Sequence, residues 1–229
     1  SKIASSDKVK KVQKDFEATH VRPERLMKTL FTDEAYVKAN VDEARLMRRL
    51  FDLACNMQSH DTDMQLYSLF TDEECYDLWS CNNLYWYLTH ACSPVTDGLM
   101  PYREADLLRN ILDRADAALK EGKNQATLRF GHESCLLPLV ALLELNHYGE
   151  SYPDVEKLSE QWRAYDIFPM ASNVQFVFFH KKGSNDVLVK VLLNEKEAKL
   201  PVKTDVAPYY HWKDVESYYR EKLDKYQHI

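Results

Sequence analysis

Apolar residues recur every three or four positions along several parts of the chain, which is the period of a helix with one buried face. The pattern is clear at Val9, Val12 and Phe16 and again between Leu46 and Met57. Helices are therefore predicted over residues 7–19, 23–30 and 46–57 and, at the end of the chain, over residues 211–227.

Two further helices are marked by the residues at their ends. Thr71 and Glu74 have the spacing of a capping box, in which each side chain binds a backbone amide of the first turn. The aromatic residues that follow, within residues 76–87, fall near helical spacing and are expected to pack in the core. Pro101 and Gly122 bound the next predicted helix, with proline at its start and glycine just past its end.

The pattern changes after Gly122. The short apolar run ATLRF, residues 126–130, predicts a strand, and the apolar residues 135–145 predict the helix that follows it. Residues 173–180 and 186–194 are β-rich and are separated by KKGSN, a sequence typical of a hairpin turn. The strand segments are apolar enough for burial on both faces, which implies neighbouring strands that this chain does not supply.

These elements predict an α/β protein in two parts. Residues 1–122 are expected to form a mostly helical region, and residues 123–229 are expected to form part of an α/β core. Three predicted strands make a poor sheet by themselves, so part of the domain is expected to be missing from this chain.

Composition narrows the classes of function. The chain of 229 residues has a net charge of -6, which argues against a general nucleic-acid binder. No apolar run reaches the roughly 18 residues that span a bilayer, so no membrane partner is expected. The five cysteines lack the two-residue spacing of metal ribbons, although one disulfide is an open alternative. The eight histidines lack the H-x-x-x-H spacing, so neither a metal nor a cofactor is expected.

His132 and Glu133 stand where the predicted strand turns into a helix. Ligands of open α/β sheets bind at this position, because the following helix directs free amides outward. A histidine there can bind an anion, and a carboxyl group beside a bound phosphate can protonate a leaving alkoxide. The alternative is that the pair has no catalytic role: Glu133 only lies in the first helical turn, and His132 caps that helix.

A second pair, His60 and Asp61, serves as a comparison. It follows a helix rather than a strand and has no glycine before it. We expect it to lie in a loop, with Asp61 or Thr62 capping the next helix.

Three stretches resemble the histidine acid phosphatase family, and within it the inositol polyphosphate phosphatases and phytases. These stretches are LRFGHESCLLPLVALLEL, FPMASNVQFVFFH and VKVLLNEKEAKLPV, and the helical first part, notably CNNLYWYL, resembles the family's inserted helical domain. The resemblance implies that His132 contacts phosphate and that Glu133 is the proton donor. Some branches place the acid one position later, where this chain has Ser134, but serine is a far poorer acid than a carboxyl group.

The family's nucleophilic histidine lies in an R-H-G-x-R-x-P motif, and none of these 229 residues forms it. A further phosphate-binding arginine expected downstream of that motif also lacks a counterpart. The resemblance therefore implies the C-terminal portion of a phosphatase, which would be inactive without the missing N-terminal portion.

For the whole enzyme, the resemblance implies cleavage of a phosphate ester, such as an inositol phosphate, through a phosphohistidine and without a cofactor. It also implies a periplasmic or secreted location. One alternative is a non-catalytic helical interaction module, supported by the helix-rich first half and its aromatic residues. A second is a metal-dependent hydrolase, which the histidine spacing disfavours.

Overall fold

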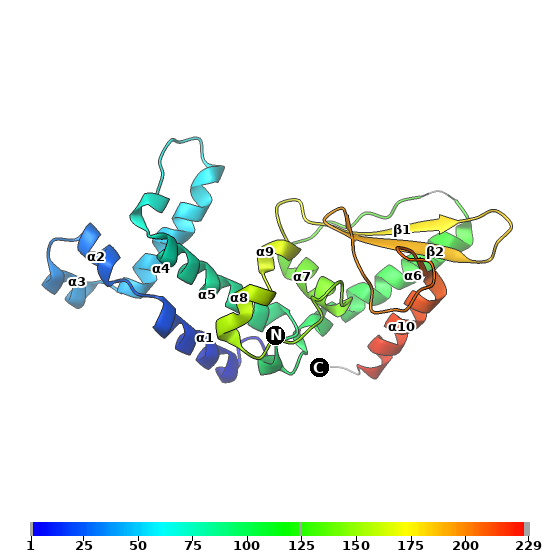
Figure 1. Cartoon of the computed structure of the whole chain (residues 1–229), viewed down its shortest axis with the longest axis horizontal. Coiled ribbons are helices and arrows are strands. Elements are labelled where there is room, and N and C mark those ends of the chain that lie inside the picture. The colour runs from blue at the N-terminus through cyan, green and yellow to red at the C-terminus, as the bar shows by residue number, and fades with distance from the viewer. Residues whose placement is uncertain (1, 124, 227–229) are drawn as a thin grey trace. The chain divides into compact units, whose positions relative to one another are not determined.

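The computed structural model describes residues 2–123 and 125–226, which form helices and a small antiparallel sheet (Figure 1). Contacts divide the chain into two compact units: the helical unit, Ser6–Tyr85, and the mixed unit, which holds the residues from Trp86 onward and the first five residues. The sequence predicts a boundary near residue 122, between a helical region and part of an α/β core. The division into two compact units does not test that boundary, so it stays a prediction.

The helical unit is built from short amphipathic helices that follow the apolar spacing. The predictions for residues 7–19, 23–30 and 46–57 are confirmed. The sequence pattern missed one helix, Glu34–Asn40, which buries a single apolar side chain, Val37, and begins at the side-chain cap Asp33. The elements of this unit are α1 (Asp7–His20), α2 (Glu24–Leu30), α3 (Glu34–Asn40), α4 (Glu43–Asn56), η1 (Met57–Ser59), η2 (Tyr67–Leu69) and the first part of α5 (Asp72–His90).

The connection between η1 and η2 contains the comparison pair, His60 and Asp61. The pair lies in a loop as predicted, but the expected cap is wrong. The Thr62 hydroxyl accepts a hydrogen bond from the Met64 amide at 3.2 Å and closes a turn, and the next helical turn begins later, at Tyr67.

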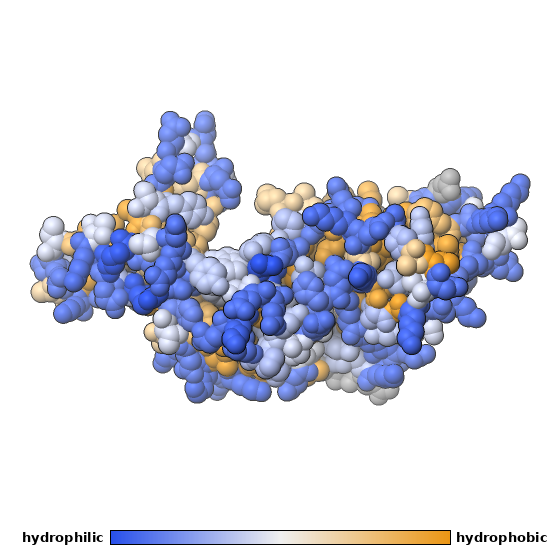
Figure 2. Space-filling view, in the orientation of Figure 1, coloured by the Kyte–Doolittle hydropathy of each residue, from blue (hydrophilic) through white to orange (hydrophobic). Residues whose placement is uncertain are grey.

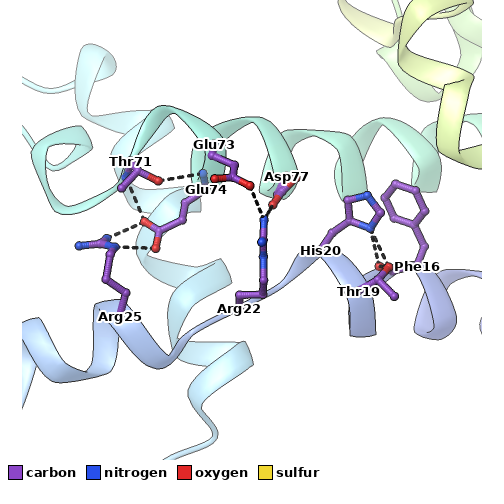
Figure 3. Close-up of polar contacts among 9 residues, drawn as sticks. All are labelled: Phe16, Thr19, His20, Arg22, Arg25, Thr71, Glu73, Glu74 and Asp77. Carbon is purple, nitrogen blue, oxygen red and sulfur yellow. Dashed lines mark hydrogen bonds and ion pairs between the residues drawn. The ribbon is translucent and has the colours of Figure 1, made fainter.

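The start of α5 is the predicted capping box. The Thr71 amide donates to Glu74 Oε2 at 2.9 Å, and the Glu74 amide donates to the Thr71 hydroxyl at 3.2 Å (Figure 3). Arg25 adds two bonds to the same carboxylate, at 2.7 and 2.5 Å, and Arg22 bonds Glu73 at 2.9 Å. The Arg25 guanidinium lowers the pKa of Glu74, because it stabilises the ionised form.

Replacement of Glu74 by alanine should destabilise the helical unit by about 2 kcal/mol, because it removes half of the capping box and the Arg25 ion pair. The matched control is Glu73→Ala, in the same turn, whose side chain is 72% exposed. It should cost no more than about 0.5 kcal/mol. Urea unfolding measures both values, and equal losses would contradict this account of the α5 start.

The aromatic residues of α5 only partly follow the core prediction. Tyr87 is fully buried, and its hydroxyl donates to Tyr152 O at 3.2 Å. In contrast, Tyr76 and Tyr85 are exposed. The expected packing in the core is therefore observed for Tyr87 but not for these two residues.

The mixed unit packs its remaining helices around the apolar α7. Its helical elements are the end of α5, η3 (Pro94–Thr96), η4 (Met100–Glu104), α6 (Ala105–Glu121), α7 (Glu133–Leu142), η5 (Val155–Lys157), α8 (Leu158–Gln161), α9 (Ala164–Ile167) and α10 (Trp212–Lys225). The predicted helices at 135–145 and 211–227 are confirmed within the described residues. Gly122 ends α6 with a left-handed φ of 64°, as a helix-terminating glycine should.

The sheet contains the predicted hairpin. Strand β1 (Val174–His180) pairs antiparallel with β2 (Val187–Leu193), and the short β3 (Lys196–Glu197) and β4 (Tyr210–His211) also pair with β2. Val189, Val191 and Leu193 of β2 are buried, and their neighbours are half-buried. The sequence predicts that these strands are buried on both faces, and this is not observed. Hydrophobic residues lie on the visible surface over this hairpin (Figure 2).

The strand predicted at residues 126–130 does not form. The segment carries no assigned secondary structure, and Leu128 and Phe130 are 75% and 95% exposed. A strand requires a hydrogen-bonded neighbour, and no other strand of the described residues pairs with this segment.

Helix α10 holds the carboxyl end of α7. The Tyr219 hydroxyl donates to Leu143 O at 2.7 Å, and Lys222 Nζ donates to Leu142 O at 2.7 Å. Carbonyl groups at a helix end lack partners within the helix, so these bonds satisfy groups that would otherwise be buried without one. The position of α7 in the mixed unit therefore depends on α10.

His211 fastens the start of α10 to the hairpin. Its ring contacts Asp186 through Nδ1 at 3.0 Å and Asp205 through Nε2 at 2.8 Å. Both nitrogens can donate only in the protonated ring, so the two carboxylates raise the pKa of His211, with Asp205 the larger cause. In turn, His211 lowers the pKa of Asp205.

These shifts predict a pH window of stabilisation. The raised histidine pKa means that stabilisation is complete below about pH 6.5 and is lost as the pH rises through the raised value. The Asp205 contribution is present above about pH 3.9 and is lost as the pH falls. The melting temperature of wild type minus that of His211→Gln should therefore shrink as the pH rises above about 6.5. His180→Gln is the control, and a pH-independent His211 difference would contradict the prediction.

Candidate functional site

The predicted pair lies at the amino end of α7. His132 occupies the cap position with φ −116° and ψ 163°, and Glu133 is the first helical residue. The amides of Cys135 and Leu136 both donate to His132 O at 3.0 Å. The preceding amides, of Glu133 and Ser134, come before the first bond of the helix and point out of its end, where an anion is favoured.

Both side chains of the pair are exposed and have no polar partner among the described residues. His132 is the cap residue and Glu133 lies in the first turn, as the alternative has it, but the His132 side chain makes no cap hydrogen bond. Within residues 2–123 and 125–226, neither the His132 ring nor the Glu133 carboxylate has a hydrogen bond or ion pair. Both groups are therefore available to a ligand.

His90, at the end of α5, is a neighbour that the sequence analysis missed. It is 6% exposed, and its Nδ1 lies 2.7 Å from the Thr89 hydroxyl. The pKa of His90 is lowered to about 4, mainly by burial and also by the positive charge of Arg103, while the negative charge of Glu133 opposes the shift. His90 is therefore neutral near pH 7 and lies within electrostatic reach of both Arg103 and Glu133.

Arg103 and Glu104 come from η4, which packs against α7. Arg103 Nε lies 3.9 Å from Glu104 Oε1, and burial raises the pKa of Glu104. Sequence spacing offered no signal for His90 or Arg103, because both Arg103 and Glu133 act on His90 only through the packing of separate elements. The start of α7 itself supplies helix amides and an exposed carboxyl group, which are groups that can bind an anion and transfer a proton.

Other chemistries find less support among the described residues. Residues 2–123 and 125–226 contain no group of three histidine, cysteine, aspartate or glutamate side chains placed to hold a metal ion. The five cysteines are free thiols. No helix in the described parts of the chain is long and apolar enough to cross a membrane.

Comparison with known proteins points to phosphatases. The chain is 28% identical over 134 residues to multiple inositol polyphosphate phosphatase 1 of Homo sapiens, and the match covers 53% of this chain and 27% of the relative. Crystal structures of a Bifidobacterium longum multiple inositol polyphosphate phosphatase share the fold. The complex with inositol hexasulfate gives a TM-score of 0.61 at 22% identity, and the complex with phosphate gives 0.63 at 20%.

These matches cover only part of each relative. They span 77% and 79% of this chain but 38% and 40% of the two Bifidobacterium chains. The family model described as "Histidine phosphatase superfamily (branch 2)" matches residues 3–194. The chain therefore belongs to branch 2 of the histidine phosphatase superfamily.

Proposed function

We propose that this chain supplies the proton-donor half of a phosphomonoester hydrolase that acts on inositol polyphosphates or related phosphate esters. The observation that carries the proposal is the exposed, uncommitted pair His132 and Glu133 at the start of α7, in a chain of this superfamily. Its human relative is named an inositol polyphosphate phosphatase, and a Bifidobacterium relative is described in complex with inositol hexasulfate.

In the proposed reaction, a histidine from a further segment attacks phosphorus and the bond to the leaving oxygen breaks. Glu133 gives its proton to that oxygen, while His132 and the amides at the start of α7 bind the phosphoryl oxygens. Water then cleaves the phosphohistidine and releases phosphate. No step of this sequence requires a metal or a cofactor.

One open strand edge and one exposed segment support the proposal that a further segment completes the fold. Strand β1 pairs only with β2 among the described residues, so its other edge is free. Residues 126–130 are exposed, and they include the apolar side chains of Leu128 and Phe130. Exposed apolar strand edges are places where another strand can add. We propose that the segment bearing R-H-G-x-R-x-P contributes such strands, and, from the family alone, that the enzyme is periplasmic or secreted.

Phosphate release from inositol hexakisphosphate tests the proposal. The purified 229-residue chain should release no phosphate above background, because none of its residues forms the nucleophile motif. A polypeptide that joins this chain to a segment with that motif should be active, and its acid-quenched mixture should contain phosphohistidine.

Two outcomes would contradict this account. Phosphate release by the rigorously pure chain would refute the proposal that the nucleophilic histidine comes from a further segment. Inactivity of a folded, joined polypeptide toward phosphate esters would favour the alternative, a non-catalytic interaction module.

A further inference from the structure

A pocket of about 550 Å³ lies at the carboxyl end of α7, within the mixed unit. Its walls include Pro94, Ala141 and Leu142. Helix α7 has 10 residues and is about 15 Å long, so the pocket is separate from His132 and Glu133 at the other end. The phosphatase proposal gives this pocket no role.

A lysine, a glutamate and a tyrosine are linked at the pocket. The Lys222 side chain is 16% exposed, and its Nζ lies 3.2 Å from Glu144 Oε2. The Tyr218 hydroxyl donates to the same carboxylate oxygen. The Lys222 ammonium also lies 5.9 Å from the centre of the Tyr102 ring. Two residues that line the pocket, Lys222 and Glu144, are therefore paired as ammonium and carboxylate, and Tyr218 bonds the carboxylate from outside the lining.

The backbone at the pocket is held in an uncommon conformation. Glu144 and Asp97, which both line it, have φ values of 53°, in the left-handed region that side chains other than glycine rarely adopt. A Cβ atom added to Gly149 would lie 2.5 Å from Glu144 Cγ, so a close backbone approach confines the glutamate. Residues of this kind are kept in place by their surroundings and often occur at ligand sites.

The charges of the pocket restrict its ligand. Its charged lining residues are one lysine, Lys222, and two acids, Asp97 and Glu144. The balance is one negative charge, which disfavours an anionic ligand. Burial lowers the pKa of Lys222, although Glu144 opposes the shift, and a lower pKa makes more of the amine available as a nucleophile.

We propose that this pocket binds a small uncharged aldehyde or ketone and that Lys222 Nζ forms an imine with it. The ammonium first gives a proton to Glu144. The free amine forms a bond to the carbonyl carbon, and the carbonyl oxygen becomes a hydroxyl by taking a proton from nitrogen. Glu144 then protonates this hydroxyl, which leaves as water. The product is a protonated imine, so Lys222 keeps its positive charge, but its single N–H can donate to Glu144 or to Leu142 O and no longer to both.

Reductive trapping tests the proposal on the full chain. The protein is incubated with glyceraldehyde, an uncharged aldehyde, in the presence of cyanoborohydride, and modified lysines are quantified by peptide mass spectrometry. Lys213 and Lys225, which are exposed on the same helix, are internal controls. Lys222 should react faster than both, and its rate should rise at a lower pH, because burial lowers its pKa and leaves more of the free amine. Equal or slower labelling of Lys222 overturns the proposal.

Two comparisons test the ligand class and the role of the acid. Glyoxylate, an anionic aldehyde, should label Lys222 more slowly than glyceraldehyde does, relative to Lys225, and the reverse order overturns the assignment of an uncharged ligand. Glu144→Gln should slow labelling of Lys222, even though it removes a charge that raises the lysine pKa, whereas the control Glu221→Gln, at an exposed position of α10, should not. Unchanged or faster labelling in a folded Glu144→Gln variant overturns the acid role.

Discussion

Replacing Glu133 with glutamine in the joined, active polypeptide is expected to lower kcat for inositol hexakisphosphate by about 10²–10⁴-fold, the usual contribution of a general acid. Glutamine keeps the size and hydrogen-bonding capacity of the side chain but has no proton to give. The loss should be much smaller for 4-nitrophenyl phosphate, because its leaving group is stable without protonation. Steady-state rates on the two substrates measure the difference.

The control for this variant is Ser134→Ala, which removes the group at the other possible donor position. It should change kcat little if Glu133 is the donor. The assignment of Glu133 is wrong if Glu133→Gln leaves the rate and its pH profile unchanged. A large loss in Ser134→Ala, confined to the substrate with the poor leaving group, would move the role to Ser134.

A second large effect is expected in the core that supports α7. Leu137 is fully buried in this helix, and its replacement by alanine should lower the free energy of unfolding by about 2–5 kcal/mol, because it removes apolar contacts and leaves a cavity. Denaturant unfolding of the chain measures the loss.

The matched control is Leu128→Ala, since Leu128 is 75% exposed in the segment before the site. It should change the stability of this chain by less than about 0.5 kcal/mol. A comparable loss in both variants would mean that residues 126–130 are packed in solution, in conflict with their exposure in the structure.

Helix ends were predictable from the sequence because the interactions that set them are local. Thr71 and Glu74 lie three residues apart and bond each other's amides, and Gly122 takes the left-handed conformation that ends α6. The β1–β2 hairpin was equally predictable from the sequence, since its strands are adjacent in the chain and are joined by a short turn. In contrast, a strand at residues 126–130 would need a hydrogen-bonded partner from elsewhere. The apolar residues of the segment do not show whether such a partner is present.

The same contrast applies to the candidate site. His132 and Glu133 were located correctly at a helix start because a glycine and an apolar run mark that boundary. Their roles stay predictions. His90 and Arg103 escaped notice, because the electrostatic links of His90 to Arg103 and to Glu133 join residues that are distant in the sequence. Nothing in the spacing of His90 distinguishes it from the other polar residues of an aromatic helix.

The hold of α10 on α7 has a consequence for the order of events during synthesis. Tyr219 and Lys222 follow their carbonyl partners on α7 by 76 and 80 residues. While the ribosome is still making those residues, the nascent α7 can already pack against η4, which precedes it in the chain, but its last carbonyl groups lack their partners. A ribosome that stalls before α10 would therefore display an α7 whose carboxyl end is open to water or to another hydrogen-bond donor.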